Sequence, residues 1–276
     1  MKTLIIGAKG MLGHELARVF ADYKPILWTR DEIDITNQTQ VDEKITTLSP
    51  QLIINAAAYT NVDECETNET LARNINGQAV LYLAETAAKA GATLVHYSTD
   101  YVFDGDKKEG YGEDDEPNPI NAYGRSKLVG EQAIQASGLK NWYIIRTAWL
   151  YGKNGKNFVE KILSLAESGK PLKVIDDQIG SPTYAVDLAQ ATRELVEDKK
   201  PTGIYHRTNS GQTTWYGFAK EIFTVFNKNV DLSPCTTEEY PLPAKRPAWS
   251  VLQSTKLEPM RDWKESLCAY AQERQQ

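Results

Sequence analysis

Short, mostly apolar segments alternate with longer amphipathic segments through the first half of the chain, and this alternation constrains the fold more than any other feature. The apolar segments fall at residues 4–6, 25–28, 52–55, 93–98 and 142–146. Strands of this kind are buried on both faces, as parallel strands between two layers of helices are. Apolar residues at helical spacing predict helices over residues 12–20, 37–48, 71–90 and 122–136. We therefore predict an α/β fold, a Rossmann-type doubly wound parallel sheet.

The second half of the chain has a looser pattern, with helices predicted over residues 154–168, 183–197 and 215–226 and several prolines between and after them. A length of 276 residues suits one large domain with a smaller lobe. We expect an NAD(P)-binding domain over residues 1–150. Residues 151–276 are expected to form a smaller C-terminal substrate-binding lobe, with some segments returning to the first domain. Residues 104–119 predict a long exposed loop, either an active-site cover or a solvated excursion.

Charge and cysteine content narrow the classes of partner. The chain has 31 Lys and Arg against 37 Asp and Glu, a net charge of −6, so no nucleic-acid partner is expected. Three widely spaced cysteines argue against a disulfide framework or a zinc site and fit a reducing compartment. The first apolar segment reaches glycine at Gly7, too early for a signal peptide, and no apolar run is long enough to span a membrane. We expect a cytoplasmic protein without membrane contact.

Three glycines lie where the first predicted strand leads into the first predicted helix. Gly7, Gly10 and Gly13 are spaced as GxxGxxG, and Met11 and Leu12 begin the helix between them. Glycine allows a tight turn and a close approach of the backbone to a pyrophosphate, while amides at a helix N-terminus favour negative charge. In this position the glycines favour dinucleotide binding over a purely structural turn.

The end of the second predicted strand bears on the choice of cofactor. An acidic residue here would bind the ribose 2′-hydroxyl of NAD, but the chain has Thr29 and Arg30. Because an arginine suits a 2′-phosphate, NADPH is favoured and NADH remains possible. A solvated arginine is the alternative, and the adjacent Asp31 weakens the inference. Asp34 and Ile35 are expected beside the adenine.

Tyr123 and Lys127 lie four residues apart on a predicted helix, so their side chains share one face. A lysine ammonium beside a phenol favours the phenolate and is expected to lower the tyrosine pKa, which makes the tyrosine a proton donor or acceptor near neutral pH. Such a pair alone is common on protein surfaces. Here it follows a predicted strand that ends in Ser98 and Thr99, whose hydroxyls are suited to bind a carbonyl oxygen. Hydroxyl, tyrosine and lysine together predict an oxidoreductase site.

The glycine turn and the Tyr123–Lys127 pair resemble those of the extended short-chain dehydrogenase/reductases. Four further stretches are similar to the dTDP-4-dehydrorhamnose reductase family: residues 98–105 (STDYVFDG), 146–152 (RTAWLYG), 177–183 (DQIGSPT) and 246–247 (RP). The resemblance covers nearly the whole chain. It implies NAD(P)H-dependent reduction of the C4 ketone of dTDP-4-dehydro-L-rhamnose to dTDP-L-rhamnose. A monomer or a homodimer is expected.

The resemblance also implies roles for individual residues. Tyr123 would protonate the C4 oxygen, Lys127 would hold the nicotinamide ribose and lower the Tyr123 pKa, and Thr99 would orient the carbonyl. The implied substrate contacts are Thr99, Asp100, Tyr101, Trp149 and Arg246. Trp149 as a core aromatic and Arg246 in a surface salt bridge are the alternatives. The expected cofactor contacts are Gly7, Gly10, Met11, Leu12, Gly13, Thr29, Arg30, Asp34, Ile35, Ala57, Ala58, Tyr59, Thr60, Tyr123 and Lys127.

Three further points follow from the resemblance. Some family members use Mg²⁺ with a glutamate early in the first helix, where this chain has Glu15. No acidic partner is found near residues 185–186, so we expect no metal and a solvated Glu15. The alternative functions are a sugar-nucleotide epimerase or dehydratase of the same superfamily and a non-catalytic NADP-binding regulatory subunit.

Overall fold

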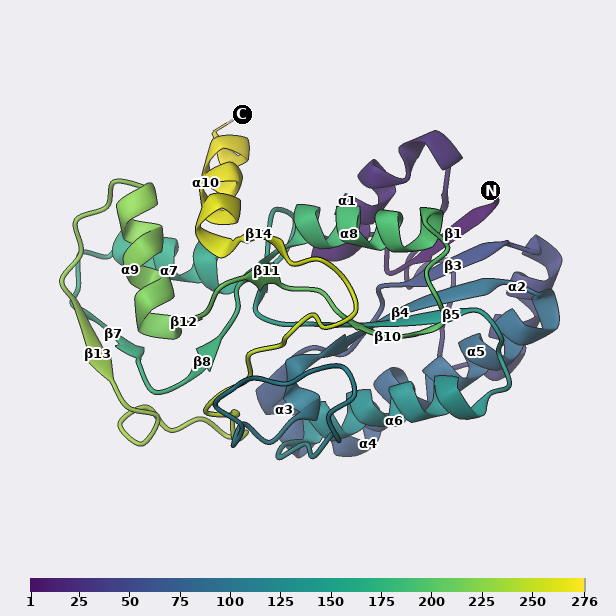
Figure 1. Cartoon of the computed structure of the whole chain (residues 1–276), viewed down its shortest axis with the longest axis horizontal. Coiled ribbons are helices and arrows are strands. Elements are labelled where there is room, and N and C mark those ends of the chain that lie inside the picture. The colour runs from purple at the N-terminus through teal and green to yellow at the C-terminus, as the bar shows by residue number, and fades with distance from the viewer. Residues whose placement is uncertain (276) are drawn as a thin grey trace.

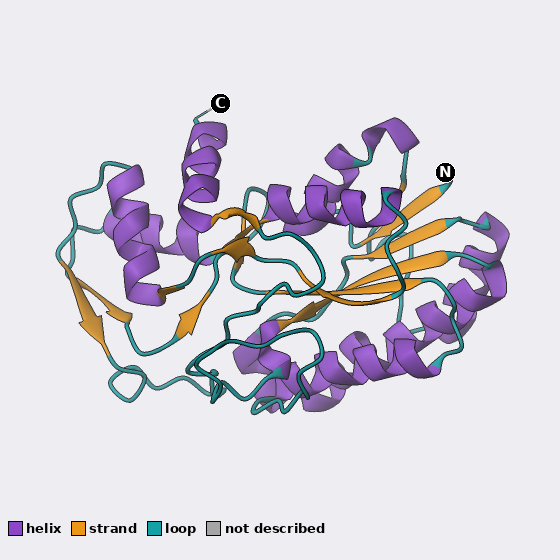
Figure 2. Cartoon of the chain, in the orientation of Figure 1, coloured by secondary structure: helices purple, strands orange, loops and turns teal. Residues whose placement is uncertain are grey.

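The computed structural model describes residues 1–275, and its larger part is built on a six-stranded parallel sheet (Figures 1 and 2). The strand order is β10-β5-β4-β3-β1-β2. The strands are β1 (Thr3–Ile6), β2 (Ile26–Trp28), β3 (Leu52–Asn55), β4 (Thr93–Thr99), β5 (Trp142–Thr147) and β10 (Gly203–His206). β2 and β3 lie on opposite sides of β1, so the direction in which successive strands are added to the sheet reverses at β1. In open α/β sheets, ligands bind at the carboxyl ends of the strands beside such a reversal.

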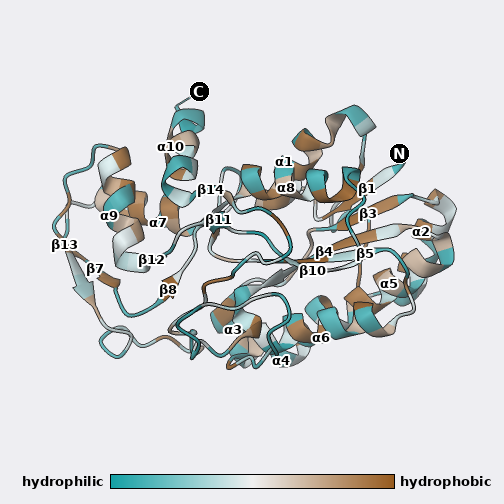
Figure 3. Ribbon diagram, in the orientation of Figure 1, coloured by the Kyte–Doolittle hydropathy of each residue, from teal (hydrophilic) through white to brown (hydrophobic). Residues whose placement is uncertain are grey.

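Helices cover both faces of this sheet, because both faces of the strands are apolar (Figures 1 and 3). α1 (Met11–Val19) and α8 (Ala185–Glu197) lie on one face, where Leu16 and Leu188 pack against Ile5. The other face is covered by α2 (Gln38–Leu48), α5 (Ala79–Ala90) and α6 (Ala122–Ala136). The doubly wound parallel sheet predicted from the sequence is therefore confirmed.

A smaller group of elements has its own apolar core on the other side of the molecule (Figure 1). Its helices are α7 (Phe158–Ala166), α9 (Trp215–Val225) and α10 (Trp263–Arg274). Four two-stranded sheets accompany them: β6–β9 (Leu150–Tyr151, Thr183–Tyr184), β7–β13 (Leu172–Ile175, Leu232–Cys235), β8–β12 (Ile179–Gly180, Thr213–Thr214) and β11–β14 (Asn209–Ser210, Met260–Asp262). The core is mainly aromatic, with Tyr151, Phe218 and Tyr270 fully buried.

Several predicted elements differ in detail from the structure. The single helix expected over residues 71–90 consists of α4 (Glu69–Arg73), a π-helical turn η2 (Asn74–Gln78) and α5. α10 and the edge strand β10 were not among the predicted elements. β10 joins the sheet although it lies far along the chain. The remaining elements are the short helix α3 (Val62–Thr67) and the 3₁₀ turns η1 (Ala21–Tyr23) and η3 (Asp100–Val102). Within residues 1–275, no helix has the length and apolarity needed to cross a membrane.

A buried ion pair joins α6 to the sheet. The guanidinium of Arg146, on β5, donates to both carboxylate oxygens of Glu131, with N–O distances of 2.9 and 2.6 Å. Both side chains are 1% exposed. Arg146 also lies 5.0 Å from the ring centroid of Phe103 and 3.4 Å from His206 Nε2. Removing one member of such a pair leaves the other charge buried without compensation.

Replacing Glu131 with alanine is therefore expected to lower the free energy of unfolding by about 3–5 kcal/mol, measured by urea denaturation. Glu69→Ala is the matched control. Glu69 of α4 pairs with Arg125, which lies on α6 as Glu131 does, but both side chains of this pair are 39% exposed. That change is expected to cost about 1 kcal/mol at most. Equal losses in the two variants would contradict a structural role for the buried pair.

Candidate active site

The glycine turn between β1 and α1 is closed tightly against the end of β3. Gly7 has a φ of +81°, and a Cβ added there would lie 2.7 Å from the amide nitrogen of Ala57. A Cβ on Gly13 would lie 2.2 Å from the carbonyl oxygen of Gly7. Larger residues are excluded at both positions, so the first turn of α1 lies directly against the backbone of the turn. The result is an exposed helix N-terminus at the carboxyl edge of the sheet, which suits a pyrophosphate.

A cleft of about 850 Å³ opens from this turn. It is lined by Ile6, Gly7, Lys9, Gly10, Thr29, Arg30, Asp31, Ile33, Asp34, Ile35, Thr36, Ala56, Ala57, Ala58, Leu71 and Ile75. Eight of the expected cofactor contacts, from the glycine turn and from the ends of β2 and β3, are thus brought together around one cleft. Met11, Leu12, Gly13, Tyr59, Thr60, Tyr123 and Lys127 are not part of its lining. Gly13 acts instead through the packing of α1 against Gly7.

The charged groups at the end of β2 differ in whether they already have a partner within the protein. Lys9 forms an ion pair with Asp31 at 2.7 Å. The amide and hydroxyl of Thr29 both donate to the carboxylate of Glu32. Arg30 is exposed and makes no hydrogen bond or ion pair within residues 1–275. Its guanidinium therefore remains available to a ligand in the cleft, and the nearby carboxylates are already occupied.

A second group of polar side chains lies where β4 ends. Thr99 is 6% exposed, and its hydroxyl donates to Asp100 Oδ1 at 2.9 Å and accepts from the amide of Tyr101 at 3.2 Å. The ring of Tyr101 meets that of Tyr123 edge-on, with centroids 6.0 Å apart. The structure thus places Thr99, Asp100, Tyr101 and Tyr123 together, as expected for one site.

The ionisation of Tyr123 differs from the expectation. Burial of the ring and the nearby Asp100 carboxylate raise the Tyr123 pKa above its usual value of 10. The Thr99 hydroxyl lowers the pKa, but burial outweighs this effect. The expected lowering of the Tyr123 pKa by Lys127 is therefore wrong for this arrangement, because the lysine amine is bound elsewhere.

Lys127 is buried, with 2% of its surface exposed, and its Nζ lies 3.2 Å from His96 Nε2. Burial lowers the pKa of Lys127 from 10.5 to about 8. His96 is itself completely buried on β4, as a hydrogen-bonded strand residue, and its pKa is well below the usual value because of burial and the nearby Lys127. No sequence pattern pairs His96 with Lys127, since their contact joins a strand to a helix 31 residues away.

The two more distant residues that were expected to contact the substrate, Arg246 and Trp149, each have a partner within the protein. Arg246 binds Asp63 through two nitrogens, at 2.6 and 2.8 Å, and its side chain is only 12% exposed. The rings of Trp149 and Trp215 are stacked, with their centroids 3.5 Å apart. The backbone φ of Trp149 is +46°. Asp63 and Trp215 were not predicted to belong to the site. A salt bridge for Arg246, the alternative noted from the sequence, is present in the structure but is largely buried.

Glu15 is not solvated as expected. It is 4% exposed and pairs with Arg18 at 2.8 Å, and the same guanidinium lies 3.6 Å from Glu273. A buried carboxylate at this position is stabilised by its neighbouring arginine. Within residues 1–275, no group of three or more His, Cys, Asp or Glu side chains is arranged to hold a metal ion.

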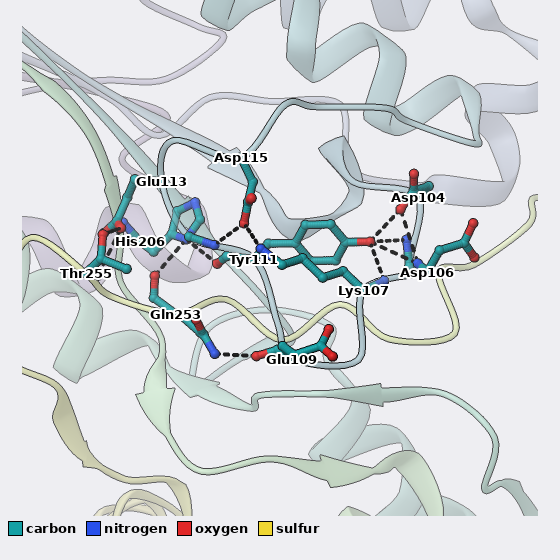
Figure 4. A network of polar contacts seen from close by, with 12 residues as sticks. Asp104, Asp106, Lys107, Glu109, Tyr111, Glu113, Asp115, His206, Gln253 and Thr255 are labelled. Carbon is teal, nitrogen blue, oxygen red and sulfur yellow. Dashed lines mark hydrogen bonds and ion pairs between the residues drawn. The ribbon is translucent and has the colours of Figure 1, made fainter.

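The segment 104–119 is less exposed than the sequence indicated (Figure 4). Tyr111 is 5% exposed, stacks on Phe103 at 4.2 Å, and its hydroxyl accepts from three backbone amides and donates to Asp104. Glu113 is buried and accepts from the amide of His206 and from Thr255. The prediction of an exposed loop was therefore wrong for this central part, which is fixed to β10 and to residues 252–255.

These features define an extended short-chain dehydrogenase/reductase. The whole chain, residues 1–276, matches the RmlD substrate binding domain model. It is 43% identical to the Spore coat polysaccharide biosynthesis protein SpsK of Bacillus subtilis (99% of this chain, 98% of the relative) and 39% identical to a dTDP-4-dehydrorhamnose reductase of Burkholderia thailandensis (93% and 92%). The chain belongs to the dTDP-4-dehydrorhamnose reductase family.

Solved structures agree with this assignment. The dTDP-4-dehydrorhamnose reductase from Bacillus anthracis, crystallised in complex with NADP, has a TM-score of 0.95 and 39% identity over 99% of this chain and 100% of that one. A UDP-glucose 4-epimerase from Thermus thermophilus has a TM-score of 0.83 over 99% of this chain and 98% of that one, at 19% identity, which shows a shared fold alone.

Asp100 makes the stability of the site dependent on pH. Burial raises its pKa from 3.8 to about 7, against the opposing hydrogen bond from Thr99. The folded protein thus binds a proton that the unfolded chain has already lost, so this group lowers the free energy of unfolding as pH rises from about 4 to about 7. Asp100→Asn is expected to stabilise the protein by up to about 4 kcal/mol at pH 8, and by less than half as much at pH 5.

The measurement is urea denaturation of both proteins at the two pH values. Asp106→Asn, at an exposed position in the adjacent loop, is the control and is expected to change stability equally at both. An Asp100→Asn effect that does not vary with pH would contradict the raised pKa.

Proposed function

We propose that the chain reduces the C4 ketone of dTDP-4-dehydro-L-rhamnose to dTDP-L-rhamnose with NADPH. The observation that supports this most is the group Thr99, Tyr123 and Lys127 at the carboxyl edge of a parallel sheet whose glycine turn opens a dinucleotide-sized cleft. Family membership supplies the substrate class, because relatives over nearly the full chain are named for this reaction.

The residues around the cleft fit NADPH. The close contact of Gly7 with Ala57 leaves room for a pyrophosphate at the N-terminus of α1, and the free guanidinium of Arg30 suits a 2′-phosphate. The proposed contacts also include Gly10, Met11, Leu12, Gly13, Thr29, Asp34, Ile35, Ala57, Ala58, Tyr59 and Thr60. When bound, NADPH supplies the hydride for the ketone carbon.

The chain's own residues supply the proton and hold the substrate. Tyr123 keeps its proton at neutral pH because its pKa is raised, so it can donate that proton to the forming alkoxide. Thr99 orients the carbonyl oxygen, and Lys127 holds the nicotinamide ribose. Lys127 also balances the negative charge left on Tyr123 after it has donated its proton. Asp100, Tyr101 and Trp149 contact the sugar. Arg246 binds the diphosphate, for which it exchanges part of its contact with Asp63.

A different keto-sugar nucleotide is the main alternative, and the relatives give it specific support. A Streptomyces antibioticus protein named a probable dTDP-4,6-dihydroxy-2-methyloxan-3-one 4-ketoreductase is 39% identical over 97% of this chain. Epimerase or dehydratase activity has no such support, since those neighbours are under 20% identical. A non-catalytic regulatory role has no observation in its favour. A cytoplasmic monomer or homodimer remains a prediction.

Tyr123→Phe tests the proposed proton donor. Because the variant lacks the hydroxyl but keeps the ring, NADPH binding is expected to persist while turnover falls by about 10²–10⁴-fold. The measurement is NADPH oxidation with dTDP-4-dehydro-L-rhamnose, repeated with dTDP-4-keto-6-deoxy-D-glucose. Tyr240→Phe, at a 52% exposed position, is the control. Near-native turnover by the Tyr123 variant would refute this role.

Arg30→Ala tests the choice of cofactor. Loss of a charge-assisted contact with a phosphate is expected to raise the KM for NADPH about 10–100-fold and leave the KM for NADH nearly unchanged. Steady-state kinetics with each cofactor measure the difference. Lys170→Ala removes an exposed cation from the other lobe and is expected to change neither KM. Parallel increases for both cofactors would show that Arg30 does not read the 2′-phosphate.

A further inference from the structure

A buried chain of hydrogen bonds leads from the backbone at the end of β3 to Lys127. The amide of Ala57 donates to Asn55 Oδ1 at 3.1 Å. Asn55 Nδ2 lies 3.1 Å from His96 Nδ1, and His96 Nε2 lies 3.2 Å from Lys127 Nζ. The three side chains are 1%, 0% and 2% exposed, so these bonds are shielded from bulk solvent.

The backbone amide fixes the direction of every bond in this chain. A backbone N–H can only donate, so the atom of Asn55 that faces Ala57 must be its oxygen. The amide nitrogen of Asn55 then faces His96 and donates to Nδ1, which must carry a lone pair. A neutral imidazole with a bare Nδ1 has its proton on Nε2.

This tautomer determines what Lys127 can be. The protonated Nε2 of His96 donates to Lys127 Nζ, and only an uncharged amine has a lone pair to accept. An ammonium would bring two donors face to face. Restoring an acceptor at Nε2 would require a proton on Nδ1, opposite the amide protons of Asn55. The complete set of bonds is therefore consistent only with a neutral lysine.

The surroundings of Lys127 agree with this assignment. Glu131 is the carboxylate that favours the charged form, but it is bound by Arg146 of β5 at 2.6 Å. Tyr123, one turn earlier on α6, keeps its proton, and neither β3 nor η2 carries a titratable side chain. Burial lowers the Lys127 pKa to about 8, so the ammonium predominates below that pH and the uncharged amine above it. The other carboxylates on elements packed against α6 are Asp100 of η3, Asp63, Glu64 and Glu66 of α3, Glu69 of α4 and Glu85 of α5; Asp63 and Glu69 are already paired with arginines.

We propose that Asn55 and His96 are positioning residues that favour the uncharged amine of Lys127 in the ligand-free protein. A neutral Lys127 is a proton acceptor, whereas an ammonium is not. Uptake of a proton breaks its bond to His96 and releases the side chain on the face of α6 that it shares with Tyr123. The kinetic consequence rests on the proposed function, but the ionisation state of the lysine does not.

The first test uses the full ligand-free protein without any substitution. Nitrogen-15 NMR of the labelled imidazole identifies the His96 tautomer at pH 7, and a titration of the ¹³Cε signal of Lys127, assigned by comparison with Lys127→Met, gives its pKa. The Nε2-protonated tautomer and a lysine pKa well below 10.4 are expected. A proton on Nδ1, or an ordinary lysine pKa, would overturn the proposal.

The second test reverses the relay with a near-isosteric change. Asn55→Asp accepts from Nδ1–H, which turns Nε2 into an acceptor for an ammonium, so the Lys127 pKa is expected to rise by about 1–3 units. The added carboxylate alone also raises this pKa. Asn55→Asp combined with His96→Phe keeps the carboxylate but removes the relay, and a much smaller rise is expected there. Equal rises would refute the relay.

If the proposed reduction is also correct, the alkaline limb of the kcat/KM profile moves with the Lys127 pKa in the Asn55→Asp variant. A moved lysine pKa with no turnover of either keto-sugar nucleotide, even in the unmodified protein, would refute the proposed function and leave the relay intact. An unchanged Lys127 pKa in a variant of an enzyme that turns over the substrate would refute the relay and leave the proposed function intact. If Asn55→Asp does not fold, the tautomer and titration of the unmodified protein still decide.

Discussion

The close packing of α6 against the carboxyl edge of the sheet is the constraint on which the site depends. A Cβ on Gly124 would lie 2.0 Å from the carbonyl oxygen of Tyr101, and one on Gly130 would lie 2.3 Å from that of Asn76. The helix therefore rests directly on η3 at one end and on η2 further along. This contact buries Lys127, which lies between the two glycines, and partly buries Tyr123, which immediately precedes Gly124. A helix further from the sheet would leave both side chains in water, with ordinary pKa values.

Burial has one consistent effect on the titratable groups of the site. It raises the pKa of Asp100 and of Tyr123 and lowers that of Lys127, so all three are driven toward their uncharged forms. The charged pair Arg146–Glu131 lies close by but is internally compensated. Such a site develops charge only when a proton moves, and in a region of low dielectric constant each movement has a large energetic effect. A substrate carbonyl therefore enters surroundings that hold few competing charges.

The sequence predicts the parts of this arrangement that are local in the chain. The apolar segments gave the strands of the sheet up to β5, and the four-residue spacing of Tyr123 and Lys127 placed both on one helix face. The parts that failed depend on contacts between distant segments. His96 meets Lys127 across 31 residues and Arg246 meets Asp63 across 183, and no periodicity encodes either contact. The lowered Tyr123 pKa was wrong for the same reason, since it assumed a lysine free of other partners.

Local pairing of charges also explains how an acidic protein can serve anionic ligands. Two cations near the site, Lys9 and Arg246, are each bound to a carboxylate, Asp31 and Asp63. The net charge of −6 does not attract an anionic ligand. Such a ligand must also compete with these carboxylates for each cation. The exchange differs between the two cations, because the Lys9–Asp31 pair is exposed whereas the Arg246 side chain is only 12% exposed. Within residues 1–275 Arg30 has no such carboxylate partner, so the phosphate contact proposed for it requires no exchange.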